Sequence, residues 1–170
     1  MFDSRVLGVD PGVARLGLAA VARDGRRPAL VWADTVTTAA DAPEAERLLA
    51  LARSVRSAIA AHRPASVAVE RVAFNRNQVS ALMVARAIGA VMVVAAEAGL
   101  AVEEYSPTEV KSAVTGAGDA DKRQVRDALE RVHGFQNLPR KPDAVDAAAV
   151  ALTHLVGSRL RAAARLGAAR

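Results

Sequence analysis

The sequence predicts an α/β fold built on a mixed five-stranded sheet flanked by helices. Two observations support this class. Short apolar runs follow one another with only short turns near the N-terminus, and such strands pair antiparallel. Later apolar runs are separated by helical patterns, as in parallel pairing. A chain of 170 residues buries enough surface for one compact domain, which we expect over residues 1–156.

The first three strands are expected at residues 5–9, 15–23 and 29–37. The first is an apolar run that stops at Asp10-Pro-Gly, a turn signal. A polar turn over residues 24–27 separates the other two. The three strands therefore form an antiparallel meander.

A helix and a fourth strand follow the meander. Pro43 and Glu44 open a helix to about His62, in which four apolar residues recur at helical spacing. Pro64 breaks it, and residues 66–70 form another short strand of the buried type. Arginines take up other faces of this helix: Arg47, Arg53 and Arg56.

The helix expected over residues 78–98 is apolar on nearly every side. A helix without a polar face is usually buried on several sides, and in a domain this small one side is a candidate subunit contact. Gly99 ends the helix, and residues 101–105 form the fifth strand.

The rest of the chain is expected to be helical. A short helix follows Pro107, a glycine-rich loop covers residues 115–119, and a further helix covers residues 121–133. The last helix starts at Asp143 and reaches about Leu155 or beyond. The basic tail, residues 157–170, is expected to be a frayed helix that contacts phosphates nonspecifically.

The composition permits a polyanionic partner but does not require one. The net charge is +5 and the pI is near 10.6, as in many nucleic-acid-binding domains. However, 40 alanines and 20 arginines against three lysines also fit a coding bias. In that background Lys111, Lys122 and Lys141 are exceptions, as expected where a compact point charge is needed.

Several classes of protein are excluded by composition. The absence of cysteine rules out disulfide scaffolds, thiol catalysis and cysteine zinc sites. The longest uncharged apolar stretch, residues 87–96, is half the length of a membrane span. The N-terminus lacks the apolar core of a secretory signal, so we expect a cytoplasmic protein without a membrane partner.

Four acids stand where acids are unusual. Asp10 and Glu70 each end a strand, although strands are depleted in acidic residues. In an open sheet the carboxyl ends of parallel strands gather at the edge where ligands bind. Asp143 and Asp146 share one face in the first turn of the last helix. Taken singly, Asp143 is an ordinary helix-start acid and Asp10 a turn residue.

Clustered carboxylates repel one another unless a cation neutralises them. Oxygen ligands without cysteine or a spaced histidine pair indicate Mg²⁺ or Mn²⁺ rather than zinc. Two such ions about 3.5–4 Å apart are typical of phosphodiester hydrolysis. We therefore expect Asp10, Glu70, Asp143 and Asp146 to converge in one anionic pocket.

The same residues carry a family likeness. Val9-Asp-Pro-Gly, Val69-Glu-Arg-Val, Ser80-Ala-Leu, Val110-Lys, Gly118-Asp-Ala-Asp-Lys with Gln124-Val, and Asp143-Ala-Val-Asp-Ala with Ala151-Leu-Thr-His resemble the RuvC family of bacterial Holliday-junction resolvases. The match runs in order over about residues 5–156 and needs almost no gaps. Each motif is weak alone, whereas the ordered set is strong.

The resemblance implies an RNase H-like fold and a homodimer. It also implies Mg²⁺-dependent nicking of four-way DNA junctions in recombination and repair, giving 5′-phosphate and 3′-hydroxyl ends. By it, Asp10, Glu70, Asp143 and Asp146 are the catalytic, metal-binding acids, and branch-migration proteins are partners. Lys111 and Lys122 fall on the basic positions of the family that contact DNA.

One position departs from the family pattern. Members often carry an aromatic residue three positions after the glutamate, where this chain has Ala73 and places Phe74 one residue later. Phe74 with Arg76 is a candidate wedge that stacks on a base; the alternative is a loop residue folded onto the core. His154 is expected to pack or to support the site, not to bind metal.

Three other functions compete. The nearest is another RNase H-like nuclease acting on RNA, which shares Asp10 and Glu70 but is disfavoured by Lys111 and the 118–122 segment. An ATP-binding module of the actin and sugar-kinase type needs a second half that 170 residues cannot hold. A noncatalytic DNA-binding protein explains the charge but not the acids that end strands.

Overall fold

The computed structural model describes residues 5–25, 27–71 and 78–167. Its strands are β1 (Arg5–Asp10), β2 (Arg15–Asp24), β3 (Arg27–Thr37), β4 (Ser66–Glu70) and β5 (Ala101–Tyr105). Its helices are α1 (Glu44–His62), α2 (Gln78–Glu97), α3 (Pro107–Thr115), α4 (Lys122–Arg131) and α5 (Pro142–Gly167). The candidate wedge residues Phe74 and Arg76 lie outside the described residues.

One five-stranded sheet organises the chain, in the order β3-β2-β1-β4-β5. β1, β2 and β3 form the antiparallel meander, and β1, β4 and β5 pair parallel. The predicted mixed sheet is confirmed.

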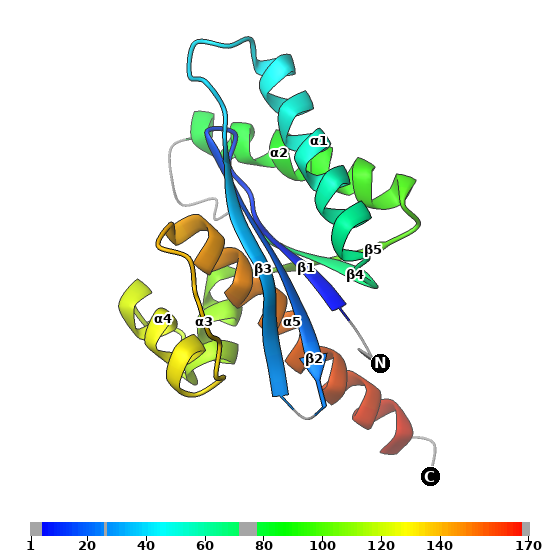
Figure 1. Ribbon diagram of the computed structural model, residues 1–170, viewed down its shortest axis with the longest axis vertical. Helices are drawn as coiled ribbons and strands as arrows, with labels where there is room; N and C mark the ends of the chain where they lie inside the picture. The colour runs from blue at the N-terminus through cyan, green and yellow to red at the C-terminus, as the bar shows by residue number, and fades with distance from the viewer. Residues whose placement is uncertain (1–4, 26, 72–77, 168–170) are drawn as a thin grey trace.

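Helices cover both faces of the sheet (Figure 1). α1 and α2 pack on one face, over a core that includes Leu7, Val9 and Val69. α3, α4 and α5 pack on the other, over a core that includes Val6, Ala68 and Tyr105. Because side chains alternate along a strand, Asp10 and Glu70, which lie an even number of residues from Val6 and Ala68, belong to the α5 face.

α5 lies unusually close to the sheet. A methyl group on Gly8 of β1 would overlap the backbone carbonyl of Ala147, and one on Gly17 of β2 would overlap that of Asp143. Small residues on α5 complete the contact, since Ala144, Ala147 and Ala151 are fully buried. Glycine is required at both strand positions because the helix backbone occupies the space of a side chain.

Two helices go beyond what the sequence predicted. α5, expected to reach about Leu155 or beyond, continues as a helix to Gly167. The domain boundary at residue 156 and the fraying of the basic tail stay predictions. The 158–166 stretch is rich in alanine and arginine, both strong helix formers.

A second difference concerns α2. By length and composition alone, α2 qualifies as a helix that could cross a membrane, whereas the sequence predicted no span. The prediction counted uncharged residues only, and Arg86 interrupts that run. In the fold, Arg86 Nη1 bonds both carboxylate oxygens of Glu44 on α1, at 2.7 and 2.6 Å, and Ala87, Val91 and Ala95 pack into the core.

Candidate active site

Two of the four predicted acids meet at the ends of neighbouring parallel strands. Val9 of β1 lies opposite Val69 of β4, so the next residues, Asp10 and Glu70, end their strands side by side. The side chain of Asp10 acts directly on Glu70 and lowers its pKa, although burial has the larger, opposite effect.

The other two acids are brought to the same sheet edge by the N-terminal turn of α5. Gly17 pairs with Asp10 in the β1–β2 ladder, and Gly17 is the residue that the backbone of Asp143 covers. The close packing of α5 on the meander therefore sets the position of Asp143 relative to Asp10. Asp146 follows one turn later on the helix.

The electrostatics of Asp10 show that the four acids act on one another. Burial, followed by the charges of Glu70, Asp146 and Asp143, raises the pKa of Asp10 from 3.8 to about 8, and Lys122 opposes the rise. A pKa raised this far keeps Asp10 protonated at neutral pH.

Glu70 is perturbed in the same direction. Burial raises the pKa of Glu70, and the charge of Asp146 adds to the effect. The hydrogen bond from Asp10 and the charges of Lys122 and Lys111 act the other way.

Lys122 neutralises one of the acids. Its ammonium lies 2.6 Å from a carboxylate oxygen of Asp146, and this hydrogen bond raises the pKa of Lys122. Lys122 is the first residue of α4, whose start is fixed by a capping box between Asp121 and Gln124.

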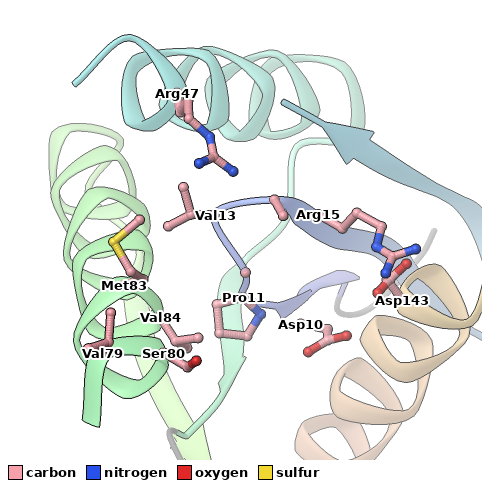
Figure 2. A pocket seen from close by; sticks show the side chains of 12 residues that line it. Asp10, Pro11, Val13, Arg15, Arg47, Val79, Ser80, Met83, Val84 and Asp143 are labelled. Carbon is pink, nitrogen blue, oxygen red and sulfur yellow. The ribbon is translucent and has the colours of Figure 1, made fainter. Parts of the chain in front are cut away.

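The acids line two adjoining cavities rather than one pocket. A cavity of about 520 Å³, here called the lysine cavity, is lined by Glu70, Arg71, Lys111, Lys122 and Asp146 among others. A cavity of about 440 Å³, here called the arginine cavity, is lined by Asp10, Arg15, Arg47, Met83 and Asp143 among others (Figure 2). Pro11, Ser80 and Val84 line both.

The donor set suits a hard divalent cation, although the carboxylates are not closed around one position. Among the described residues, which include all four acids, no group of three or more acidic or histidine side chains is spaced to hold one metal ion. The four acids nonetheless act on one another, since the charges of Glu70, Asp146 and Asp143 all raise the pKa of Asp10. Their convergence on shared cations stays a prediction.

The side chain of His154 on α5 contacts two strands of the sheet. Its Nε2 lies 3.0 Å from the hydroxyl of Ser66 on β4, and its Nδ1 lies 2.9 Å from the hydroxyl of Tyr105 on β5. Tyr105 is the register partner of Glu70. His154 thus ties α5 to the two strands beside the acids.

Sequence reasoning missed two residues of this region, Arg15 and Arg47. Both line the arginine cavity with Asp10 and Asp143, and Figure 2 shows Arg47 reaching from α1 toward Val13. Nothing in the sequence separates Arg47 from Arg53 and Arg56 on the same helix.

Comparison with solved structures identifies the class of protein. Thermus thermophilus RuvC in complex with its Holliday junction substrate is 37% identical, with a TM-score of 0.86, and the match covers 92% of this chain and 96% of that one. The yeast mitochondrial Holliday junction resolvase Ydc2 shares the fold at 14% identity, with a TM-score of 0.68 over 88% of this chain and 77% of that one. The fold is that of the RNase H-like resolvases.

Sequence comparison narrows the class to one family. The family model for crossover junction endodeoxyribonuclease RuvC matches residues 6–154. A relative of that description from Chloroflexus aggregans is 43% identical over 88% of this chain and 92% of its own length. The chain belongs to the RuvC family.

Proposed function

We propose that this protein resolves four-way DNA junctions by paired symmetric nicks, through phosphodiester hydrolysis that depends on Mg²⁺. The single observation that carries the proposal is the convergence of acids from β1, β4 and α5 on one sheet edge, where burial, followed by the charges of the other three acids, raises the pKa of Asp10 to about 8. Bound cations would offset this burial and repulsion, because they are often the largest charges in such a site.

Asp10, Glu70, Asp143 and Asp146 would hold two Mg²⁺ ions, with Mn²⁺ an alternative of the same chemistry. Bound cations of this kind activate an attacking water and stabilise the leaving 3′ oxygen. The products are then a 5′-phosphate and a 3′-hydroxyl. To hold the ions, Asp10 and Glu70 would both be ionised, as would Asp143 and Asp146.

Lys122 has two partners in this scheme. It pairs with Asp146 at 2.6 Å, while its own side chain remains 76% exposed. Were Asp146 to hold a cation, the ammonium of Lys122 would be free to contact a DNA phosphate. Lys111, half-buried on the wall of the same lysine cavity, is the second cation for that strand.

The exposed apolar face of α2 supports a homodimer. Val79, Leu82 and Val93 recur at helical spacing and are 69%, 53% and 58% exposed, although most large apolar side chains avoid water. A second copy would cover this face. Two-fold symmetry would present two sites to a two-fold junction, and the nicks would be paired.

The experiment uses the full chain with a synthetic four-way junction and a linear duplex of matched sequence, in Mg²⁺ and in EDTA. We expect symmetric nicks in the junction only, and only with Mg²⁺. Asp10→Asn, Glu70→Gln, Asp143→Asn and Asp146→Asn should each lower the cleavage rate by about 100-fold or more and leave junction binding intact. Unchanged cleavage by Glu70→Gln, or equal cutting of the duplex, would contradict the proposal.

An RNA duplex of the same sequence, added as a third substrate, tests the competing function of a nuclease that acts on RNA. Faster cleavage of RNA than of the junction would favour the RNA-directed nuclease. The cytoplasmic location and the docking of branch-migration proteins also remain proposals, drawn from the family likeness.

A further inference from the structure

Arg47 is held at the edge of the acid cluster by contacts that leave its terminal nitrogens available. Its Nε donates to the hydroxyl of Thr38 at 2.9 Å, and that hydroxyl donates to the carbonyl of Val13 at 2.6 Å. The backbone amide of Thr38 also donates to the carbonyl of Ala14, at 3.1 Å. The loop that follows Asp10 thereby fixes the half-buried Arg47 side chain in the arginine cavity.

The positive charge of Arg47 is not used within the described part of the chain. No carboxylate there pairs with Arg47 or with Arg15. Glu44, one turn before Arg47 on α1, instead bonds Arg86 with both carboxylate oxygens. An arginine that is positioned but not neutralised beside a cavity is typical of a site for a phosphate or a carboxylate.

Each of the two cavities joins two cations to two of the acids. Lys111 and Lys122 line the lysine cavity with Glu70 and Asp146. Arg15 and Arg47 line the arginine cavity with Asp10 and Asp143. Since the two cavities share walls, a DNA strand that crosses the acids would place successive phosphates against both pairs of cations.

We propose that Arg47, assisted by Arg15, binds a backbone phosphate of the cleaved DNA strand, on the side of the acids away from the two lysines. The inference rests on the proposed function. Thr38 occupies Nε, so the two terminal nitrogens of Arg47 form the fork that matches two phosphate oxygens. The contact would fix the register of the strand over the acids and carry no base specificity.

The first test measures junction binding as a function of salt, in Ca²⁺ so that DNA is not cut. Loss of one phosphate contact lowers the slope of log K against log salt by about 1. We expect this change for Arg47→Ala, with about tenfold weaker binding and slower single-turnover cleavage. Arg47→Lys should keep the slope but not the full cleavage rate.

Arg53→Ala is the matched control, because Arg53 is an exposed arginine on another face of α1. It should change neither the slope nor the rate. If Arg47 only braced the loop, Arg47→Ala would lower the melting temperature and keep the wild-type slope. If the salt slope of Arg47→Ala equals the slopes of wild type and Arg53→Ala, the proposal is wrong.

The second test locates the phosphate. Once the cut is mapped, single neutral methylphosphonates are placed at each phosphate near it, and binding is measured for wild type and Arg47→Ala. We expect one position on the side away from the lysines where wild type loses affinity and Arg47→Ala loses no more, as in a double-mutant cycle. Equal losses for both proteins at every position overturn the proposal.

These outcomes separate the inference from the proposed function. A wild-type protein that cuts junctions while Arg47→Ala behaves like Arg53→Ala refutes only the role of Arg47. A wild-type protein that binds DNA with a salt slope that depends on Arg47, yet does not cut junctions, refutes the proposed function and retains the phosphate contact. A wild-type protein that binds no DNA refutes both.

Discussion

The two long apolar helices, α5 and α2, pack on opposite faces of one sheet in different ways. α5 buries Ala144, Ala147 and Leu152 completely against strands that carry glycine at the contact points. α2 buries one side and leaves Leu82 and Val93 more than half exposed. Two helices of similar composition thus pack differently. The backbone of α5 lies directly on the sheet, whereas α2 contacts the sheet only through its side chains.

The two kinds of packing fit two roles: α5 holds acidic side chains in fixed positions, and α2 offers a surface for association. The closely packed helix carries Asp143 and Asp146, and the catalytic role that we propose for them requires exact placement, since a shift of about 1 Å can lower a rate by about 100-fold. The other helix carries the surface that we assign to a second copy. Changes on α5 or its strands should therefore act on chemistry and stability together, whereas changes on the outer face of α2 should act on assembly.

The largest expected effect follows from adding a methyl group under α5. Gly17→Ala would force the backbone of Asp143 away from the sheet, at a cost in the free energy of unfolding of about 1–3 kcal/mol. The cleavage rate should fall by about 100-fold or more, since the acid moves with the helix. Thermal unfolding and junction cleavage measure the two effects.

Gly89→Ala is the matched change on α2. Nothing lies within 4 Å of a methyl group there, and alanine favours a helix over glycine by about 1 kcal/mol. In the monomeric background of Leu82→Glu with Val93→Glu, where no second copy covers this face, the melting temperature should stay the same or rise. Wild-type cleavage and stability in Gly17→Ala would contradict the account of α5.

The second prediction concerns the stability that the folded protein loses when Asp10 ionises in its buried position among the other acids. Because the folded state raises the pKa of Asp10 from 3.8 to about 8, the folded state binds more protons than the unfolded state between these values, and stability falls as pH rises through that window. At pH 8 without divalent cations, Asp10→Asn should melt higher than wild type by roughly 5 °C.

The pH dependence supplies the control for this prediction. At pH 4 the two proteins should melt alike, and Mg²⁺ at pH 8 should stabilise wild type more than Asp10→Asn. Parallel curves of melting temperature against pH would show that Asp10 is not perturbed.

The third effect concerns assembly. Leu82→Glu combined with Val93→Glu should convert a dimer into monomers, because charges on a buried apolar contact cost several kcal/mol. Sedimentation equilibrium measures the mass, and far-UV circular dichroism checks that the protomer is folded. Ser57→Glu on the exposed side of α1 should leave the mass unchanged. If the wild-type protein is a monomer, the proposed dimer contact does not exist. If the double variant remains a dimer, the contact lies elsewhere.

The smallest expected effect is on the polar link beneath the acids. Tyr105→Phe removes the hydroxyl 2.9 Å from His154 Nδ1 and should lower the free energy of unfolding by about 1–2 kcal/mol. Urea unfolding measures it. A loss as large as that of Gly17→Ala would mean that α5 is held by this link more than by close packing.

The fold was predictable because its signals are local. Short turns predicted the antiparallel meander, and helical crossovers predicted the parallel strands, as the sheet confirms. The meeting of Asp10 and Glu70 followed from parallel pairing alone. The end of α5 was not predictable from patterning, since alanine and arginine continue a helix without an apolar stripe.

The missed parts of the site depend on tertiary contacts. Arg47 and Arg53 look alike in the sequence, and only the loop that holds Thr38 beside Arg47 distinguishes them. Gly8 and Gly17 read as ordinary strand residues, because no local pattern shows that a helix backbone will lie on them. Lys122 was predicted as a DNA contact from the family likeness, but its pairing with Asp146 was not predicted.

The most direct test of the central claim, that acids of the sheet and of α5 form one cation site, is anomalous diffraction from crystals soaked in Mn²⁺. We predict anomalous peaks that contact Asp10 together with Glu70 and with the acids of α5. Peaks absent from Asp10, or bound to the strand acids without any acid of α5, would contradict the account.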